Sequence, residues 1–293
     1  MNVWLVTDRK PGHVAQLAGL AAALADRTYL CERWIDAPWQ PSPETLGGSP
    51  PDLIVCCGRA TQKPALALQA AHGGMSVVLM RPAWPWLRFD VAVVPEHDRP
   101  RSRPSVIATQ GALNAVRRSE GDTGRGLILL GGPSRHVAWN DCHVLAEIDA
   151  LVASSPGIRW RLTTSRRTPG SMLCPLIERQ GERLRVIPCE QTPPGWVADQ
   201  LAAAGHAVVT EDSVSMISEA ATSGCVTSVI GLPPLRRRSR VLEGVQRLID
   251  AGLICRVDDR AGFRPAAPLA EADRVAGLLL RRLPQSVSLP RAA

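Results

Sequence analysis

The segment from Thr210 to Gly224 carries the residues whose types and spacing best suit ligand chemistry. An apolar stretch precedes it, and it continues as a polar turn, a short helical pattern and a glycine stop, so we expect a helix to begin at the end of a strand. The N–H groups at such a helix start suit an anion such as a phosphate. Ser215 and Glu219 lie four residues apart on one face of that helix. One turn below the anion, the Glu219 carboxylate is placed to accept hydrogen bonds from ribose hydroxyls.

An ordinary capped helix in an α/β domain, with Asp212 or Ser213 as its N-cap, is the alternative interpretation of this segment. Two other polar loops favour the ligand: residues 131–136 follow one apolar strand, and residues 163–169 follow the next. Because parallel strands end at one edge of a sheet, the three loops are expected to meet there and bind an anion. The predicted phosphate-binding residues are Gly131, Gly132, Ser134, Arg135, Ser165, Arg166, Asp212, Ser213 and Ser215.

A second candidate site lies in the loop from Asp8 to His13, which follows the first predicted strand and opens a helix. His13 can act as a general base near neutral pH, and Asp8 can orient its ring. Lys10 and Gly12 belong to the same loop and are predicted to border an acceptor. The alternative is an ordinary Pro-Gly turn with an exposed histidine.

Glu96 and His97 follow the apolar strand expected over residues 89–94. They are predicted to assist proton transfer or to bind an acceptor on this side of the protein. An ordinary charged turn explains the same residues without any ligand.

The chain of 293 residues has a net charge of +7. Its positive charge is carried almost wholly by arginine, because Lys10 and Lys63 are its only lysines. Arginine provides planar, bidentate donors that suit nucleotides, anionic lipid head groups and nucleic acids alike. Nucleic acid is disfavoured because base stacking normally recruits aromatic residues, and the chain has one Tyr and two Phe. The run 236–240 either starts a solvated helix or contacts an anionic lipid or a diphosphate.

Several classes of protein are disfavoured by what the sequence lacks. It has neither a G-x-G-x-x-G fingerprint nor a Walker A motif, which counts against NAD enzymes and P-loop ATPases. Its eight cysteines include no C-x-x-C pair, and no His or Cys spacing indicates a metal site, so we expect neither a metal nor a cofactor. The first apolar stretch is too short for a signal sequence or a membrane span, so a cytoplasmic protein is expected.

Strands alternate with helices along the whole chain, which predicts an α/β fold with two Rossmann-like domains facing a cleft. The expected N-terminal domain covers residues 1–120, the expected C-terminal nucleotide-binding domain covers 121–265, and a helix in 266–293 is expected to pack back on the N-terminal domain. The polar segment 117–125 is interpreted as the linker. The expected strands lie near 3–7, 28–34, 52–56, 76–80, 89–94, 127–130, 158–163, 184–187, 206–210 and 225–230.

Taken together, these segments resemble the bacterial and plant family named for the plant mitochondrial fission factor "elongated mitochondria". The resemblance runs through residues 8–13, 57–59, 89–98, 110–112, 131–136, 165–169 and 210–224, and Ser-Arg-Arg-Thr-Pro and Asp-Ser-Val-Ser-Met are its most specific motifs. The chain departs from the family at Arg9, where a Gly is usual, and at residues 81–84, where Asp-Pro-Arg is usual.

The resemblance implies a GT-B-like fold and a glycosyltransferase that takes a nucleotide-sugar as substrate and needs no metal. It places Glu219 at the ribose, Ser213 and Ser215 at the diphosphate, and His13 near the transferred sugar, and it adds Arg59 to the acceptor side. A non-catalytic scaffold, peripheral on the inner face of an anionic membrane, is the alternative. An epimerase ranks third, because the dinucleotide fingerprint is missing. The sequence alone does not identify the sugar, the base, the acceptor or the oligomeric state.

Overall fold

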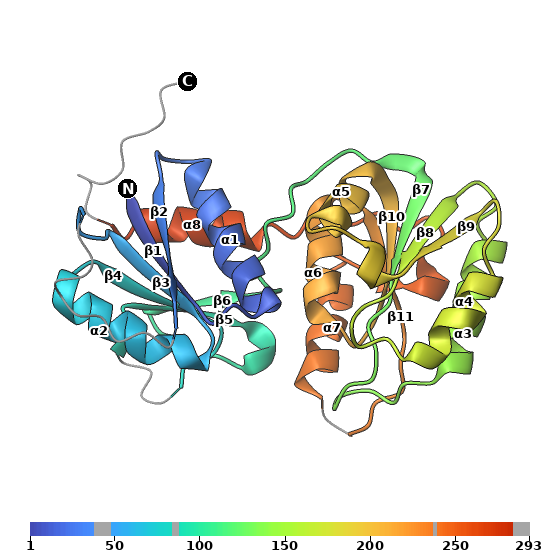
Figure 1. Ribbon diagram of the computed structural model, residues 1–293, viewed down its shortest axis with the longest axis horizontal. Helices are drawn as coiled ribbons and strands as arrows, with labels where there is room; N and C mark the ends of the chain where they lie inside the picture. The colour runs from blue at the N-terminus through green and yellow to red at the C-terminus, as the bar shows by residue number, and fades with distance from the viewer. Residues whose placement is uncertain (38–47, 84–87, 237–238, 284–293) are drawn as a thin grey trace. The chain divides into compact units, whose positions relative to one another are not determined.

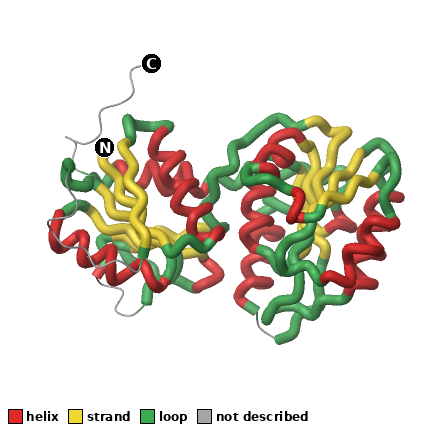
Figure 2. Tube along the Cα trace, in the orientation of Figure 1, coloured by secondary structure: helices red, strands yellow, loops and turns green. Residues whose placement is uncertain are grey.

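The computed structural model describes residues 1–37, 48–83, 88–236 and 239–283. The chain divides into two compact units: residues 1–115 with 270–293, and residues 116–269. Each unit contains its own six-stranded parallel sheet (Figures 1 and 2). The fold is therefore α/β with two doubly wound domains, as the alternating pattern predicts.

The N-terminal unit has the strand order β2-β1-β3-β4-β5-β6. Leu17 of its first helix and Val275 of its last helix lie in one core cluster, so these two helices share a face of the sheet, and Leu68 packs on the other face. The elements are β1 (Asn2–Thr7), α1 (Pro11–Ala25), β2 (Cys31–Asp36), β3 (Leu53–Cys57), α2 (Gln62–His72), β4 (Met75–Leu79), β5 (Val91–Pro95), β6 (Val106–Thr109) and α8 (Glu271–Leu280).

The C-terminal unit has the strand order β12-β11-β10-β7-β8-β9. Val144 and Leu176 pack on one face of its sheet, and Leu201, Ile217 and Val245 pack on the other, so helices cover both faces (Figure 1). The elements are β7 (Asp122–Leu129), α3 (Asp141–Ala153), β8 (Arg159–Thr163), α4 (Leu173–Glu178), β9 (Leu184–Ile187), α5 (Trp196–Ala203), β10 (Ala204–Thr210), α6 (Val214–Ser223), β11 (Val226–Ile230), α7 (Arg240–Asp250) and β12 (Cys255–Arg256).

The ten strands expected from the sequence all form, but two further strands were missed, and the linker and the start of β2 were placed wrongly. β6 and β12 are strands of four and two residues at sheet edges, which is too short for a clear strand pattern, and they were not expected. The segment interpreted as a linker contains the start of β7, because residues from Asp122 onward already pair with neighbouring strands. β2 begins at Cys31 rather than at residue 28.

No helix in the described part of the chain is long and apolar enough to cross a membrane. The helix expected near the C-terminus forms as α8 and belongs to the same compact unit as α1. Arg27 beside α1 forms an ion pair with Asp273 of α8 at 2.9 Å. Val275 and Leu279 of α8 are fully buried. The last helix thus completes the core of the N-terminal unit.

Gly19 offers a direct test of how closely this core is packed. A Cβ at Gly19 would lie 2.3 Å from the backbone carbonyl of Asn114, whereas a Cβ at Gly12 of the same helix would meet nothing within 4 Å. Gly19→Ala is therefore expected to lower the free energy of unfolding by about 1–3 kcal/mol through overpacking. Gly12→Ala is the matched control and should be neutral or stabilising by up to about 1 kcal/mol. Urea unfolding followed by circular dichroism measures both, and equal stabilities for the two variants would contradict the close packing.

Candidate functional site

The strand order of the C-terminal unit reverses between β7 and β10. From β7 the chain proceeds outward to β8 and β9, and from β10 it proceeds in the opposite direction to β11 and β12. In an open parallel sheet, the crevice at such a switch point, beyond the carboxyl ends of the strands, is where ligands bind. The loop after β7 and the N-terminus of α6 flank this point, so two of the three predicted loops border it directly.

A buried carboxylate holds these loops together. The Asp212 side chain is 0% exposed and forms an ion pair with Arg167 at 2.7 Å. Its Oδ2 atom also accepts a hydrogen bond from the N–H of Gly132 at 3.1 Å. The Ser165 hydroxyl donates to the carbonyl of Gly131 at 3.0 Å, which ties the third loop to the first. The convergence of three loops expected from the sequence is therefore present.

The loop glycines allow a close approach that no other residue would permit. A Cβ at Gly131 would lie 2.1 Å from the Asp212 carboxylate, and a Cβ at Gly132 would lie 2.0 Å from the carbonyl of Arg167. The Gly131 N–H donates to the Thr210 hydroxyl at 2.7 Å. Both glycine N–H groups thus have acceptors within the protein. Close packing is the role that the geometry gives these glycines, and their contact with a phosphate stays a prediction.

Helix α6 begins at the cap residue Ser213, whose side chain makes no capping hydrogen bond. Its first N–H groups have no partner within the helix. The Ser213 and Ser215 hydroxyls lie 3.5 Å apart at this end, with Ser213 buried and Ser215 exposed. Of the two predicted caps, Ser213 holds the cap position and Asp212 turns inward to the glycine loop. Gly224, with a φ of 93°, ends the helix as expected.

Glu219 lies one turn beyond Ser215 on α6 and is half-buried. Burial raises the pKa of its carboxyl to about 7. Among the described residues no hydrogen-bond or ion-pair partner faces this carboxyl, so burial is the sole cause of the shift. An uncompensated carboxyl next to an open helix N-terminus is a group available to a ligand.

The remaining predicted phosphate ligands lie at the outer side of the loops. The Ser134 hydroxyl accepts from the N–H of His136 at 3.1 Å, and Arg135 Nε donates to the ring of His136 at 3.2 Å. The guanidinium of Arg166 is exposed and contacts no carboxylate in the described part of the chain. Arg135 and Arg166 supply positive charge at the same edge of the sheet.

Two arginines important to this edge were not singled out from the sequence. Arg167, rather than its neighbour Arg166, pairs with Asp212, and sequence gives no signal for which of two adjacent arginines turns inward. Arg256 pairs with the buried Glu211 at 2.8 Å, and Glu211 also accepts from the N–H of Leu232 at 3.1 Å. These two residues border a pocket of about 630 Å³ beside the ends of β10 and β11.

The N-terminal unit has a switch point of its own, between β1 and β3. The predicted pair forms there: His13 Nδ1 lies 2.7 Å from Asp8 Oδ1. Burial would raise the pKa of the Asp8 carboxyl, but hydrogen bonds from His13 and Lys10 outweigh it and hold that pKa below its usual range. An ionised Asp8 fixes the Nδ1 proton and leaves Nε2 of His13 as the basic atom.

Gly58, directly after β3, makes room for the imidazole ring. Its φ is 98°, and a Cβ at this position would lie 2.6 Å from the ring of His13. A pocket of about 590 Å³ opens beside the ring and is lined by Lys10, His13 and Arg59. Lys10 and Arg59, both predicted for the acceptor side, therefore share one pocket with the predicted base His13.

Other acceptor-side predictions lie less centrally. Glu96 and His97 form a short 3₁₀ turn after β5, and the pocket lining reaches Asp98 rather than either of them. Gly12 lies in the first turn of α1 and does not line the pocket. In segment 81–84, where the sequence departs from the family pattern, residues Arg81 to Ala83 line the pocket and Trp84 lies outside the described residues. Arg237 and Arg238 of the 236–240 run also lie outside the described residues.

Several solved structures with the same architecture are described as nucleotide-sugar enzymes. A protein assigned as a UDP-N-acetylglucosamine 2-epimerase from Listeria monocytogenes matches with a TM-score of 0.60 and 13% identity, over 95% of this chain and 94% of that one. The UDP-GlcNAc 2-epimerase of Neisseria meningitidis, bound to UDP-GlcNAc, matches with a TM-score of 0.52 and 10% identity, over 96% of this chain and 100% of that one. Phytolacca americana UGT2, complexed with UDP-2-fluoro-glucose and pterostilbene, matches with a TM-score of 0.50 and 10% identity, over 96% and 90%. The predicted GT-B-like fold is confirmed.

Sequence relatives point to the family that the motifs resemble. An uncharacterized protein of Rickettsia prowazekii is 24% identical over 289 residues, which cover 76% of this chain and 81% of that protein. The mitochondrial fission protein ELM1 of Arabidopsis thaliana is 26% identical over 221 residues, which cover 62% of this chain and about half of the plant protein, 52%. The family model described as mitochondrial fission ELM1 matches residues 11–283, and the chain therefore belongs to this family.

Proposed function

We propose that the protein is a glycosyltransferase that binds a nucleotide-sugar at the β7/β10 switch point without a metal. The observation that carries the proposal is the Glu219 carboxyl, which has no partner among the described residues and lies one turn from the open N-terminus of α6. The N–H groups of α6 suit a diphosphate, and the carboxylate suits a pair of ribose hydroxyls. The fold likeness to enzymes solved with UDP or UDP-sugars supports a nucleoside diphosphate as the ligand.

The transfer step needs a base and a stabilised leaving group. In the proposed reaction, Nε2 of His13 takes the proton of an acceptor hydroxyl, whose oxygen bonds to the anomeric carbon of the sugar. The bond between that carbon and the phosphate oxygen breaks, and a nucleoside diphosphate leaves. Arg135, Arg166 and the N-terminus of α6 supply positive charge for the departing diphosphate, which is the role of Mg²⁺ in other transferases.

A second candidate function is a scaffold that keeps the nucleotide site but does not transfer a sugar. The observation that favours it is the match to a relative described as a mitochondrial fission protein, a description that names no chemistry. Docking on an anionic membrane through arginines belongs to this candidate. Epimerisation is a third: the missing dinucleotide fingerprint does not weigh against it here, because epimerases share this fold.

Nucleotide binding is the first test. Nucleoside diphosphates and nucleotide-sugars, screened in EDTA, are expected to raise the melting temperature by an amount that follows RT ln(1 + [L]/Kd). Glu219→Gln should weaken the binding of the best ligand about tenfold or more. The substitution replaces one of the two carboxylate oxygens that would accept from ribose hydroxyls by an N–H donor. Glu120→Gln, an exposed glutamate of the same unit, is the matched control. Absence of any shift in the wild type would refute the donor site.

The raised pKa of Glu219 predicts how stability changes with pH. Its folded pKa of about 7 exceeds the ordinary 4.5, so the folded state favours the protonated form. The stabilisation is full below about pH 4.5 and is lost as the pH rises through 7. Wild type should therefore lose stability relative to Glu219→Gln between pH 5 and pH 8, by on the order of 1–3 kcal/mol. Urea unfolding at the two pH values measures this, and a constant difference would show that Glu219 does not titrate in this range.

Turnover tests the role of His13. With the donor identified by binding, His13→Ala is expected to reduce the release of nucleoside diphosphate by about 10²–10⁴-fold while donor affinity stays unchanged. Gln16→Ala, on the same helix but outside the pocket lining, is the control. Full activity of His13→Ala would remove this residue from the mechanism. Donor binding without turnover in the wild type would favour the scaffold, and a returned nucleotide-sugar epimer would favour the epimerase.

A further inference from the structure

Four arginines share one face of the C-terminal sheet, two to four residues before the carboxyl ends of β7, β8 and β9. Arg159 and Arg161 are two residues apart on β8 and so point to the same side. Arg125 is the register partner of Arg159 on β7, and Arg185 is the register partner of Arg161 on β9. The face is the one that carries α5, because Leu127, two residues from Arg125, packs in the core cluster with Leu201. We call these four residues the arginine face.

Little negative charge compensates the arginine face. Arg125 pairs with Asp122 at 3.2 Å, and Arg161 donates to the side-chain oxygen of Gln200. In the described part of the chain, Arg159 and Arg185 have no carboxylate or hydrogen-bond partner for their guanidinium groups. Like charges at directly opposed positions of neighbouring strands destabilise a sheet. Repulsion within two such pairs therefore destabilises the sheet, and a bound anionic ligand would relieve it.

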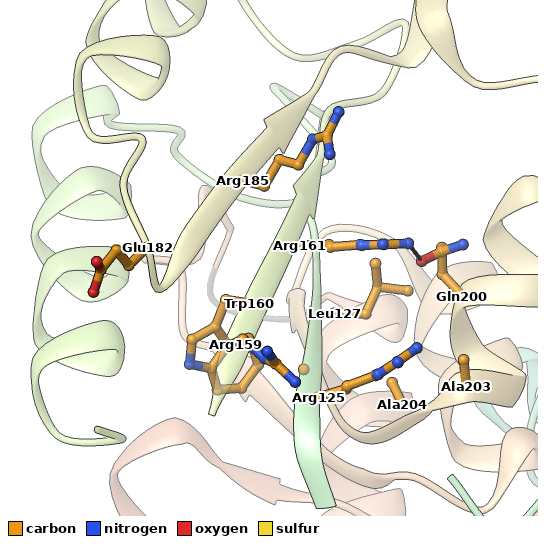
Figure 3. Close-up of a pocket in the computed structure, with 11 residues that line it drawn as sticks. Arg125, Leu127, Arg159, Trp160, Arg161, Glu182, Arg185, Gln200, Ala203 and Ala204 are labelled. Carbon is orange, nitrogen blue, oxygen red and sulfur yellow. Dashed lines mark hydrogen bonds between the residues drawn. The ribbon is translucent and has the colours of Figure 1, made fainter. Parts of the chain in front are cut away.

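The arginine face is concave rather than flat. It borders a pocket of about 300 Å³, which Gln200, Ala203 and Ala204 close on one side (Figure 3). Arg125 and Arg161 extend side by side toward these residues, while the carboxylate of Glu182 points away from the guanidinium groups (Figure 3). The small side chains at positions 203 and 204 leave the space open.

We propose that this pocket binds a small polyanion that carries at least two phosphate groups. Register partners lie about 4.8 Å apart across the sheet, and the two arginine pairs lie about 6.6 Å apart along it. The guanidinium groups of each pair extend in different directions (Figure 3), and rotation of these long side chains would let each pair hold one phosphate through bidentate hydrogen bonds. The volume is at the lower end of metabolite sites, which favours a small molecule over a membrane surface or a protein partner.

Binding of inorganic tripolyphosphate tests the pocket directly. Isothermal titration at low salt is expected to show a site that depends on the arginine face and that orthophosphate fills at least tenfold more weakly, because orthophosphate cannot engage both pairs. Arg159→Gln with Arg185→Gln should weaken tripolyphosphate at least tenfold. Arg101→Gln with Arg103→Gln, exposed arginines of the other unit, makes the same change of charge and should leave the affinity unchanged. An equal loss of tripolyphosphate affinity in both double variants would show that only the net charge matters, which would overturn the proposal.

A second variant keeps the test decisive if the arginine substitutions disturb folding. Ala203→Glu leaves the arginine face intact and places a carboxylate at the pocket wall, so it should abolish tripolyphosphate binding and retain the fold. Glu219→Gln should not change tripolyphosphate binding at this site, which separates it from the proposed nucleotide site. Unchanged affinity in Ala203→Glu would refute the pocket. The last measurement uses vesicles that contain anionic phospholipid. If the protein binds these vesicles only when Arg159 and Arg185 are present, and does not bind tripolyphosphate, the ligand is a membrane surface and the small-polyanion proposal is wrong.

Discussion

The buried carboxylate of Asp212 is the interaction on which the C-terminal site depends. It joins the turn before α6 to the glycine loop through the N–H of Gly132, and to the 163–169 loop through Arg167. A fully buried carboxylate is tolerated only where charge and hydrogen bonds compensate it. The three loops therefore adopt one mutual arrangement, and the α6 N-terminus is held beside the end of β7. The position of the proposed anion site follows from this arrangement rather than from any single predicted phosphate ligand.

Three carboxyl groups lie at or near this edge of the sheet, and their partners separate their roles. Asp212 is compensated by Arg167, and Glu211 by Arg256 and the N–H of Leu232. Glu219 is partly buried and has no ion-pair or hydrogen-bond partner among the described residues, and burial raises the pKa of its carboxyl to about 7. A carboxyl held in an ion pair serves the fold, whereas a carboxyl without an ion pair beside a helix N-terminus is a candidate for binding a ligand. The contrast supports the proposal that Glu219 is the ligand-binding member of the three.

The sequence predicts the fold and the convergence of loops well, because both follow from the order of elements. Apolar runs mark strands such as β3, where every residue is buried, and strand-to-helix turns must then lie at one edge. Contacts decided by side-chain direction are not predictable in this way. Nothing in Ser-Arg-Arg-Thr shows that Arg167 turns inward, and Asp212 follows the usual pattern of a helix cap although its carboxylate packs on Gly131. Residues 122–125 look like a linker, since polar residues at the exposed start of a central strand carry no β signal.

The departure at Arg9 illustrates how the N-terminal site keeps its geometry. Arg9 has a φ of 59°, a left-handed conformation that glycine adopts without strain and that the family resemblance associates with glycine. Its guanidinium binds both carboxylate oxygens of Asp36 at the end of β2, and its N–H donates to Thr7. The side chain thus points toward β2, away from the switch point between β1 and β3. Because the backbone keeps the turn that a glycine would make, the neighbouring Asp8 and His13 retain their 2.7 Å contact. A change of residue at this position therefore alters the rim of the site without altering the proposed base.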